Sequence, residues 1–376
     1  LYDMFERNDS LRITKGIRSQ PEWSNLEMEW QKIDIRLVEL AKFTDRLQIA
    51  LEGFENSGLL NHEDMMSEVS NVQQIGIELR HRLSEFVTSP DKNGIYWITW
   101  KNRGRDPVMH SAPLHVGEIL DRELFSKKST VVMTSATLST NNEFTHFRER
   151  IGFTDPQELL LGSPFEFSKC ANLLIPEDMP EPRSKSYQVA VDQAIMDAAL
   201  AVGGHTMALF TSHASLKFTA EAIRGKLKPL GIPVLAQHID GTPTQLMRRF
   251  LNNPKAVLLG TSSFWEGVDI AGEALEVLLL ARLPFNVPSD PVFAARSELY
   301  ETPFYEYAVP QATLRFRQGF GRLIRSKIDR GVVVVLDRRI ISKGYGKLFL
   351  ESLPDLPVKT CKLGHIRDEI RDWIGR

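Results

Sequence analysis

Two arginines three residues apart stand out in the stretch QGFGRLIRS, residues 318–326. On a helix, Arg322 and Arg325 would share one face, where their positive charges repel each other. An anionic partner relieves that repulsion, and two kinds of partner are open: a carboxylate of the protein, such as Asp329, or a bound anion. Gln318 adds a neutral donor and acceptor on the same helix. The spacing therefore indicates either an anion site or an internal ion-pair cluster.

The elements that must position these side chains alternate between apolar runs and helical segments. The apolar runs are nearly continuous, which indicates strands buried on both faces. Such strands form a mostly parallel sheet with helices on both sides, so we predict an α/β fold of the doubly wound type. The predicted strands cover residues 206–210, 233–237, 256–260, 276–281 and 332–337, with further strands at 95–100 and 131–138.

Polar residues follow several of these strands, at the sheet edge where ligands bind in such folds. Their hydroxyls and nearby backbone N–H groups suit the oxygens of a phosphate. The alternative is that serine and threonine cap the helices that follow. Polar residues recur at four strand ends, which favours a phosphate-bearing ligand over capping alone. They are Thr134, Ser135, Thr137, Thr211, Ser212, Gln237 and Thr261.

The first 90 residues or so carry apolar side chains at three- and four-residue spacing, which is typical of helices. The stretch EGFENSGLLNHED, residues 52–64, interrupts this pattern with Gly and Asn. We therefore predict a long antiparallel helical hairpin, serving as a spacer or small helical domain. A turn-rich stretch at 89–94 and a stretch rich in Pro and charge at 176–186 are the predicted boundaries.

The composition limits the classes of function. A chain of 376 residues allows two or three domains, and its net charge of −2 gives no overall basic field, although a local groove can be basic. Its two cysteines, Cys170 and Cys361, indicate a reducing compartment and exclude a four-cysteine zinc or iron–sulfur site built from this chain alone. We interpret His213 and His238 as polar loop residues and predict no metal site, because the histidines lack metal-ligand spacing.

The sequence also bears on where the protein is found in the cell. The sequence has no run of 18 apolar residues and no signal-peptide pattern. We therefore expect a cytoplasmic protein with no membrane partner.

Three stretches resemble helicase motifs, and they occur in the expected order. TSATL (134–138) resembles the third motif of superfamily 2 helicases, GTSSFWEGVDIAG (260–272) the fifth, and QGFGRLIR (318–325) the sixth. The stretches SAPL, LGSPFEF, LFTSH and LPFNVPSDP are similar to the DinG branch of the XPD/DinG family. The resemblance covers roughly residues 95 to 355.

The resemblance implies an ATP-binding, bacterial, nucleoid-associated protein made of RecA-like lobes. It implies three segments: a helical arch segment at 1–94, the terminal strands of the first RecA-like lobe at 95–140, and the second lobe at 141–376. Arg322 and Arg325 would be the arginine fingers that face the γ-phosphate, and Gln318 would help to sense it. By the same resemblance, the residues that would bind nucleotide in the cleft are Glu266, Gly267, Asp269 and Gly321. Those that would couple this cleft to the DNA groove are Thr134, Ser135 and Thr137. Those that would contact single-stranded DNA are Thr211, Ser212, Gln237, Thr261 and Trp265. Trp265 would either stack on a base or pack inside the lobe.

Two motifs of the family are missing from this chain. The sequence contains no G-x-x-x-x-G-K-[ST] loop and no D-E-A-H box. In the family both lie in the first lobe, upstream of the arch, as does the iron–sulfur cluster of some members. We therefore expect ATP and Mg²⁺ to bind mainly to that lobe, no iron–sulfur cluster in this chain, and no ATP hydrolysis by the chain alone.

The predicted function is the C-terminal portion of an ATP-dependent DNA helicase that moves along single-stranded DNA. Its predicted partners are single-stranded DNA, ATP and the first RecA-like lobe of the same parent chain. Two alternatives remain open: the helicase-like region of a 3′–5′ DNA exonuclease of DinG type, or a non-catalytic module that binds single strands.

Overall fold

The computed structural model describes residues 10–54, 61–101, 106–135, 137–139, 143–265, 274–326 and 328–375. Unit 1 comprises Leu1–Val116 and Pro288–Arg296, and unit 2 comprises Gly117–Val287 and Ser297–Arg376. This division differs from the predicted segments 1–94, 95–140 and 141–376. Residues 95–116 fold with the helical hairpin in unit 1, whereas residues 117–140 belong to unit 2.

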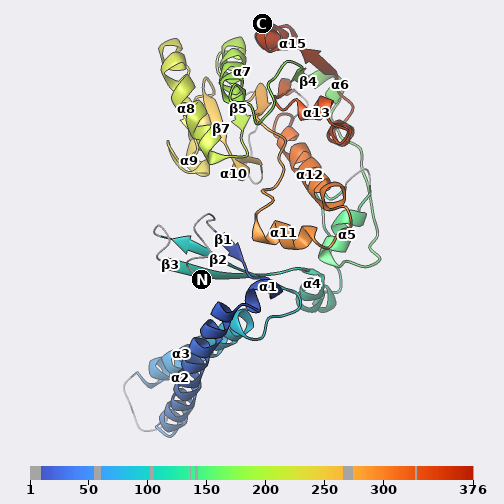
Figure 1. The fold of residues 1–376 in the computed structure, drawn as a ribbon. Helices are drawn as coiled ribbons and strands as arrows, with labels where there is room; N and C mark the ends of the chain where they lie inside the picture. The colour runs from blue at the N-terminus through green and yellow to red at the C-terminus, as the bar shows by residue number, and fades with distance from the viewer. Residues whose placement is uncertain are drawn as a thin grey trace. The chain divides into compact units, whose positions relative to one another are not determined.

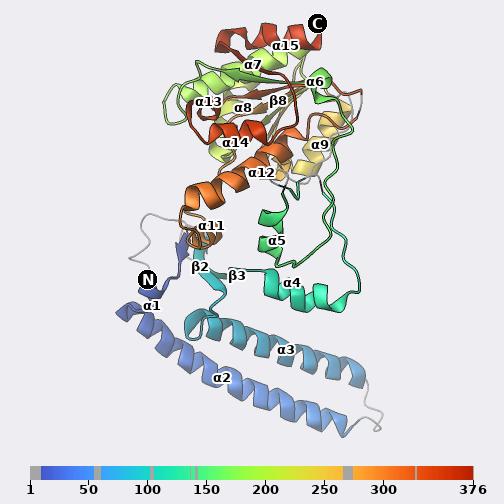
Figure 2. The same cartoon turned by 90° about the vertical axis from the view of Figure 1, so that its right-hand side faces the viewer.

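Unit 1 contains the predicted helical hairpin. Its helices α2 and α3 lie side by side along their length (Figures 1 and 2). On one flank the Arg80 guanidinium Nε donates to Asp34 at 2.6 Å, which links the two helices. The elements of unit 1 are β1 (Ser10–Arg12), α1 (Lys15–Arg18), α2 (Pro21–Glu52), α3 (His62–Val87), β2 (Gly94–Lys101), β3 (Asp106–Pro113) and α11 (Pro291–Ser297).

A small antiparallel sheet packs at the base of the hairpin. Its order is β1-β2-β3, with Ile98 of β2 opposite Leu11 and Met109. Alternate residues of β2 join a core that includes Trp23 and Phe86. The strand predicted at 95–100 is therefore present, but it pairs antiparallel and lies outside the parallel sheet.

Unit 2 confirms the predicted fold class. Among the described residues, seven strands form one sheet in the order β10-β4-β9-β8-β5-β7-β6, and every neighbouring pair is parallel. The strands are β4 (Ala171–Pro176), β5 (Thr206–Leu209), β6 (Val234–Ala236), β7 (Val257–Gly260), β8 (Val277–Leu280), β9 (Gly331–Val335) and β10 (Val358–Cys361). The predicted boundary at 176–186 is wrong, because β4 lies before it and pairs with β9 inside the sheet.

Helices cover both faces of this sheet, and alternate strand residues reach the two cores. Met207 of β5 points into one core, whereas Ala208 points into the other. Helices α7, α8 and α15 pack on one core, and α9, α12 and α14 on the other; Figure 2 shows α7 and α15 on the opposite side of the sheet from α12 and α14. The main covering helices are α7 (Tyr187–Val202), α8 (His213–Leu227), α9 (Pro243–Asn252), α12 (Val309–Phe320), α14 (Gly346–Glu351) and α15 (Ile366–Ile374).

Shorter helices complete unit 2. They are α4 (Gly117–Glu123), η3 (Phe125–Lys127), α5 (Thr145–Ile151), α6 (Phe167–Cys170), η4 (Lys228–Leu230), α10 (Ser262–Trp265), η5 (Phe304–Ala308), α13 (Arg339–Ser342) and η6 (Leu363–His365).

The strand predicted at 131–138 is not formed among its described residues. An apolar run becomes a buried strand only where neighbouring strands and helices cover it. Here Val132 is 83% exposed, and no described strand pairs with this segment.

Candidate functional site

The predicted arginines lie just beyond a helix rather than on it. Helix α12 ends at Phe320, so Gln318 occupies its last turn and the exposed Gly321 caps it. Arg322 and Arg325 follow in a turn and an irregular segment, and both are half-buried. The prediction that they share a helical face is therefore wrong.

A carboxylate holds the segment that follows the helix. Asp329 accepts hydrogen bonds from the backbone N–H groups of Arg325 and Ser326, at 2.8 and 2.9 Å, and from the Ser326 hydroxyl at 2.6 Å. These bonds fix the backbone at residues 325 and 326, beyond the end of α12. Burial alone would raise the pKa of Asp329, but the bonds from Ser326 and Arg325, together with the charge of Arg325, outweigh it and lower that pKa.

Arg322 connects the end of α12 to the segment after β7. Its guanidinium donates to the Trp265 carbonyl at 2.8 Å. The Trp265 indole in turn donates to the Phe210 carbonyl, after β5, at 3.3 Å. Trp265 is only 3% exposed, and its ring lies where a side chain on Gly319 would be. Of the two alternatives for Trp265, stacking on a base or packing inside the lobe, the structure has the second: Trp265 packs in the core of unit 2 and is corrected as a DNA contact.

The stretch TSATL also reaches α12. The Gln318 side chain donates to the Thr137 hydroxyl at 3.4 Å, and the Arg317 guanidinium donates to the Ser139 carbonyl at 3.1 Å. Burial lowers the pKa of Arg317. The Thr137 hydroxyl also lies 3.1 Å from that of Ser135, which is exposed, as is Thr134. Residues far apart in the sequence thus meet at one helix end.

The residues predicted to contact single-stranded DNA form two groups, one buried and one exposed. Gln237 and Thr261 are 2% and 3% exposed, and they bond to each other: Gln237 Oε1 accepts from the Thr261 N–H at 2.7 Å and from its hydroxyl at 3.0 Å. Thr211 is exposed. The Ser212 side chain accepts from the Ser215 N–H at 3.5 Å and so caps α8, as the capping alternative supposes.

Two histidines that we interpreted as ordinary loop residues form the exposed layer over this buried pair. The Thr261 hydroxyl lies 3.5 Å from His213 Nε2, and the Gln237 amide nitrogen lies 3.2 Å from His238 Nε2. The two imidazole rings meet edge to face, with centroids 4.8 Å apart. Their position in the sequence could have identified them as site residues, because each histidine follows a polar residue at the end of a strand.

Three further predictions concern the remaining motif residues, a metal site and a membrane span. Glu266, Gly267 and Asp269 lie outside the described residues. In the part of the chain that the structure describes, no group of three or more His, Cys, Asp or Glu side chains is placed to hold a metal ion. No helix among the same residues is both long and apolar enough to cross a membrane.

Comparisons with known proteins find similarity to helicases and to a DNA exonuclease. A family model for the helicase C-terminal domain matches residues 195–356. The chain is 37% identical over 293 residues to the 3′-5′ exonuclease DinG of Bacillus subtilis (strain 168), covering 73% of this chain and 31% of that protein. It is 36% identical over 269 residues to the ATP-dependent DNA helicase YoaA of Escherichia coli (strain K12), covering 70% of this chain and 41% of that protein.

A solved structure of XPD in its apo form shares the fold. The TM-score is 0.52 at 15% sequence identity, over 80% of this chain and 61% of that one. The parallel sheet with helices on both faces is an α/β fold of the RecA-like type, and the family model places a helicase C-terminal domain on it. The chain carries a helicase C-terminal domain and is similar to proteins of the DinG branch of the XPD/DinG helicase family. It spans about a third to two fifths of the length of these two curated relatives.

Proposed function

We propose that this chain is the C-terminal portion of an ATP-dependent DNA helicase that moves along single-stranded DNA. In this proposal ATP and Mg²⁺ bind mainly to a first RecA-like lobe supplied by another part of the protein. The present chain contributes Arg322 and Arg325, which approach the γ-phosphate from the second lobe. The relatives support this reading, since one is named an ATP-dependent DNA helicase.

The observation that carries the proposal is the meeting of three motifs at the end of α12. Gln318 bonds to Thr137, and Arg322 bonds to the Trp265 carbonyl. A change at the nucleotide would therefore reach both the TSATL segment and the strand ends beside Trp265. Phosphoryl transfer spreads negative charge over the transferred group, and a positioned guanidinium stabilises that charge. This coupling is what a motor driven by ATP requires.

The strand ends supply the proposed DNA contact. Thr211, His213 and His238 are exposed beside the buried Gln237–Thr261 pair. Hydroxyl and backbone N–H groups at these strand ends bind phosphate and sugar oxygens without reading sequence. This suits a protein that moves along any strand.

The test compares the full-length gene product with the 376-residue chain. We expect the full-length protein to hydrolyse ATP faster with single-stranded DNA, and to unwind a labelled duplex that carries a single-stranded tail. We expect the chain alone to bind single-stranded DNA in a salt-dependent manner without hydrolysing ATP. ATP hydrolysis by the purified chain would overturn the assignment of the catalytic parts to another lobe.

The same experiment distinguishes the two alternatives. Shortening of a labelled strand from its 3′ end, without unwinding, would favour the exonuclease named for the Bacillus subtilis relative. Strand binding that ATP does not alter in the full-length protein would favour a non-catalytic binding module.

A further inference from the structure

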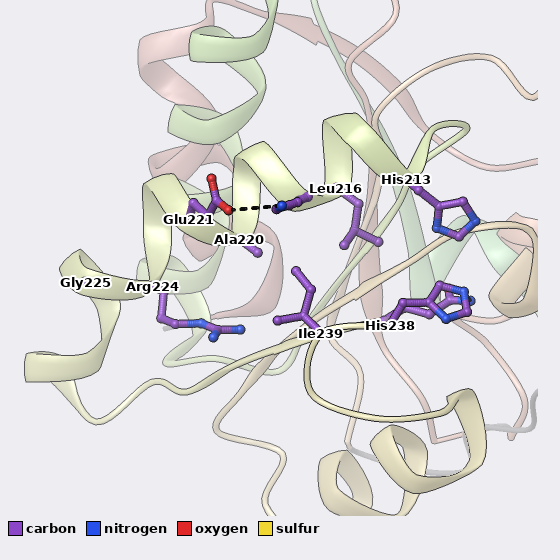
Figure 3. A pocket seen from close by; sticks show the side chains of 10 residues that line it. His213, Leu216, Ala220, Glu221, Arg224, Gly225, His238 and Ile239 are labelled. Carbon is purple, nitrogen blue, oxygen red and sulfur yellow. Dashed lines mark hydrogen bonds and ion pairs between the residues drawn. The ribbon is translucent and has the colours of Figure 1, made fainter. Parts of the chain in front are cut away.

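A groove opens beside the two exposed histidines of unit 2. Its volume is about 1040 Å³. One wall is helix α8, and the other is the loop after β6 that carries His238 and Ile239 (Figure 3). His213 and His238 stand together at one end, next to the strand ends already described. The groove thus continues the proposed DNA-binding edge.

The floor of the groove is apolar. Leu216 and Ala220 of α8 face Ile239 across it, and Ile239 is 44% exposed (Figure 3). The exposed aliphatic side chain of Ile239 and the two imidazole rings at the end of the groove together offer apolar and weakly polar contact surface. Such a surface suits the face of a planar ring better than a hydrated ion.

The charges around the groove largely cancel. The Arg224 guanidinium is paired with Asp240 at 2.5 Å, and the Lys217 ammonium lies 4.0 Å from Glu221. Phosphate groups are bound best by cations that are not already neutralised. The paired rim therefore disfavours a phosphate inside the groove and leaves donors and acceptors for the polar edge of a base.

The loop that carries His238 is held in place before any ligand arrives. Asp240 accepts the Ala236 N–H at 2.8 Å as well as the Arg224 guanidinium, and the Arg249 guanidinium donates to the Asp240 carbonyl at 2.9 Å. His238 itself has φ of 65°, a left-handed conformation that costs energy in a non-glycine residue. A fixed loop loses little entropy on binding.

We propose that this groove receives one base of a single DNA strand, with His213 and His238 as its stacking residues. The inference rests on the proposed function and adds a base-binding site to it. Gln237 and Thr261, buried beneath the histidines, then act as positioning residues through the bonds already given. Base stacking is tolerant of sequence, so the site grips a moving strand without selecting a sequence.

The test measures binding of two labelled strands to the 376-residue chain by fluorescence anisotropy at one fixed salt concentration. One strand is a 20-mer of thymidines, and the other is the same length with abasic sites in place of the bases. The variants are His213→Ala and His238→Asn, since Asn tolerates the left-handed backbone. The matched control is His365→Ala, another exposed histidine of unit 2, at the start of α15.

We expect each variant to weaken binding of the thymidine strand about 5- to 150-fold, the range given by the loss of base stacking. Binding of the abasic strand should stay unchanged, and His365→Ala should change neither. A 2-aminopurine base in the strand should lose fluorescence on binding to the wild type, and less on binding to the variants.

Several outcomes would overturn the inference. Equal loss for both strands would place the histidines on the DNA backbone, and no loss for either would mean that the groove receives no base. If the wild-type chain binds neither strand, the proposed function fails as well, which separates that failure from failure of the base site alone.

Discussion

At the scale of single residues, Asp329 fixes the segment that carries Arg325. It is nearly fully buried, and its carboxylate accepts from two backbone N–H groups and one hydroxyl. Such bonds explain how a guanidinium can be held outside a helix and still be preorganised. The adjacent charge of Arg325 helps to keep Asp329 ionised.

Asp329→Asn should lower the free energy of unfolding at pH 7 by about 1–3 kcal/mol, since a hydrogen-bonded carboxylate is lost from a buried position. The folded pKa of Asp329 is lowered. Its contribution is therefore complete above the unfolded value of about 3.9 and is lost as pH falls through the lower folded value. Urea unfolding between pH 7 and pH 3 measures this. The exposed Asp355→Asn is the control, and a difference from wild type that does not shrink with acid would contradict the account.

At the scale of elements, α12 depends on a close approach that only glycine permits. A Cβ on Gly319 would lie 2.7 Å from the Trp265 ring, well inside normal contact. The same indole ties α10 to the end of β5 through its bond to Phe210. Gly319 thus allows the helix to lie against the motif that follows β7.

Gly319→Ala should therefore destabilise unit 2 by about 1–3 kcal/mol, the usual result of overpacking a core. Helix propensity alone predicts the opposite sign, since alanine is favoured over glycine by about 1 kcal/mol. Gly225→Ala in α8, where a Cβ meets open space, is the matched control and should be neutral or stabilising. Thermal unfolding compares the two. Equal effects of both substitutions would refute the packing argument.

Elements were predictable from the sequence where apolar runs are long and covered. The five strands from β5 to β9 were predicted for that reason, as was the α2–α3 hairpin. Edge strand β10 has the short sequence VKTC, with two polar residues between Val358 and Cys361, so periodicity does not reveal it. The run at 131–138 shows the converse, since composition alone cannot supply a neighbouring strand.

The motifs predicted which residues belong to the site, but the sequence did not predict which of them are buried and which are exposed. Gln318 and Thr137 do meet, as motifs from one site should. Gln237 and Thr261, by contrast, are buried supports for exposed histidines, because sequence position at a strand end does not say which side chain faces outward. Burial is a property of the assembled fold.

At the scale of the whole molecule, each unit has its own core. In unit 1 the Arg18 guanidinium donates to the Val87 carbonyl at 2.9 Å and lies over the Trp23 ring, 4.9 Å from its centre. This interaction joins α1, α2 and the end of α3 without any residue of unit 2. The proposed motor residues all belong to unit 2, which places the proposed ATP and DNA contacts of this chain on one parallel sheet.

The central claim is that Arg322 and Arg325 act on ATP in a working motor. The most direct test measures DNA-stimulated ATP turnover by the full-length protein with Arg322→Ala and Arg325→Ala, alongside nucleotide binding. The exposed Arg338→Ala is the control. We predict that each finger variant loses about 10³-fold in turnover or more while still binding ATP, and that the control turns over normally. Full turnover in both finger variants would contradict the account.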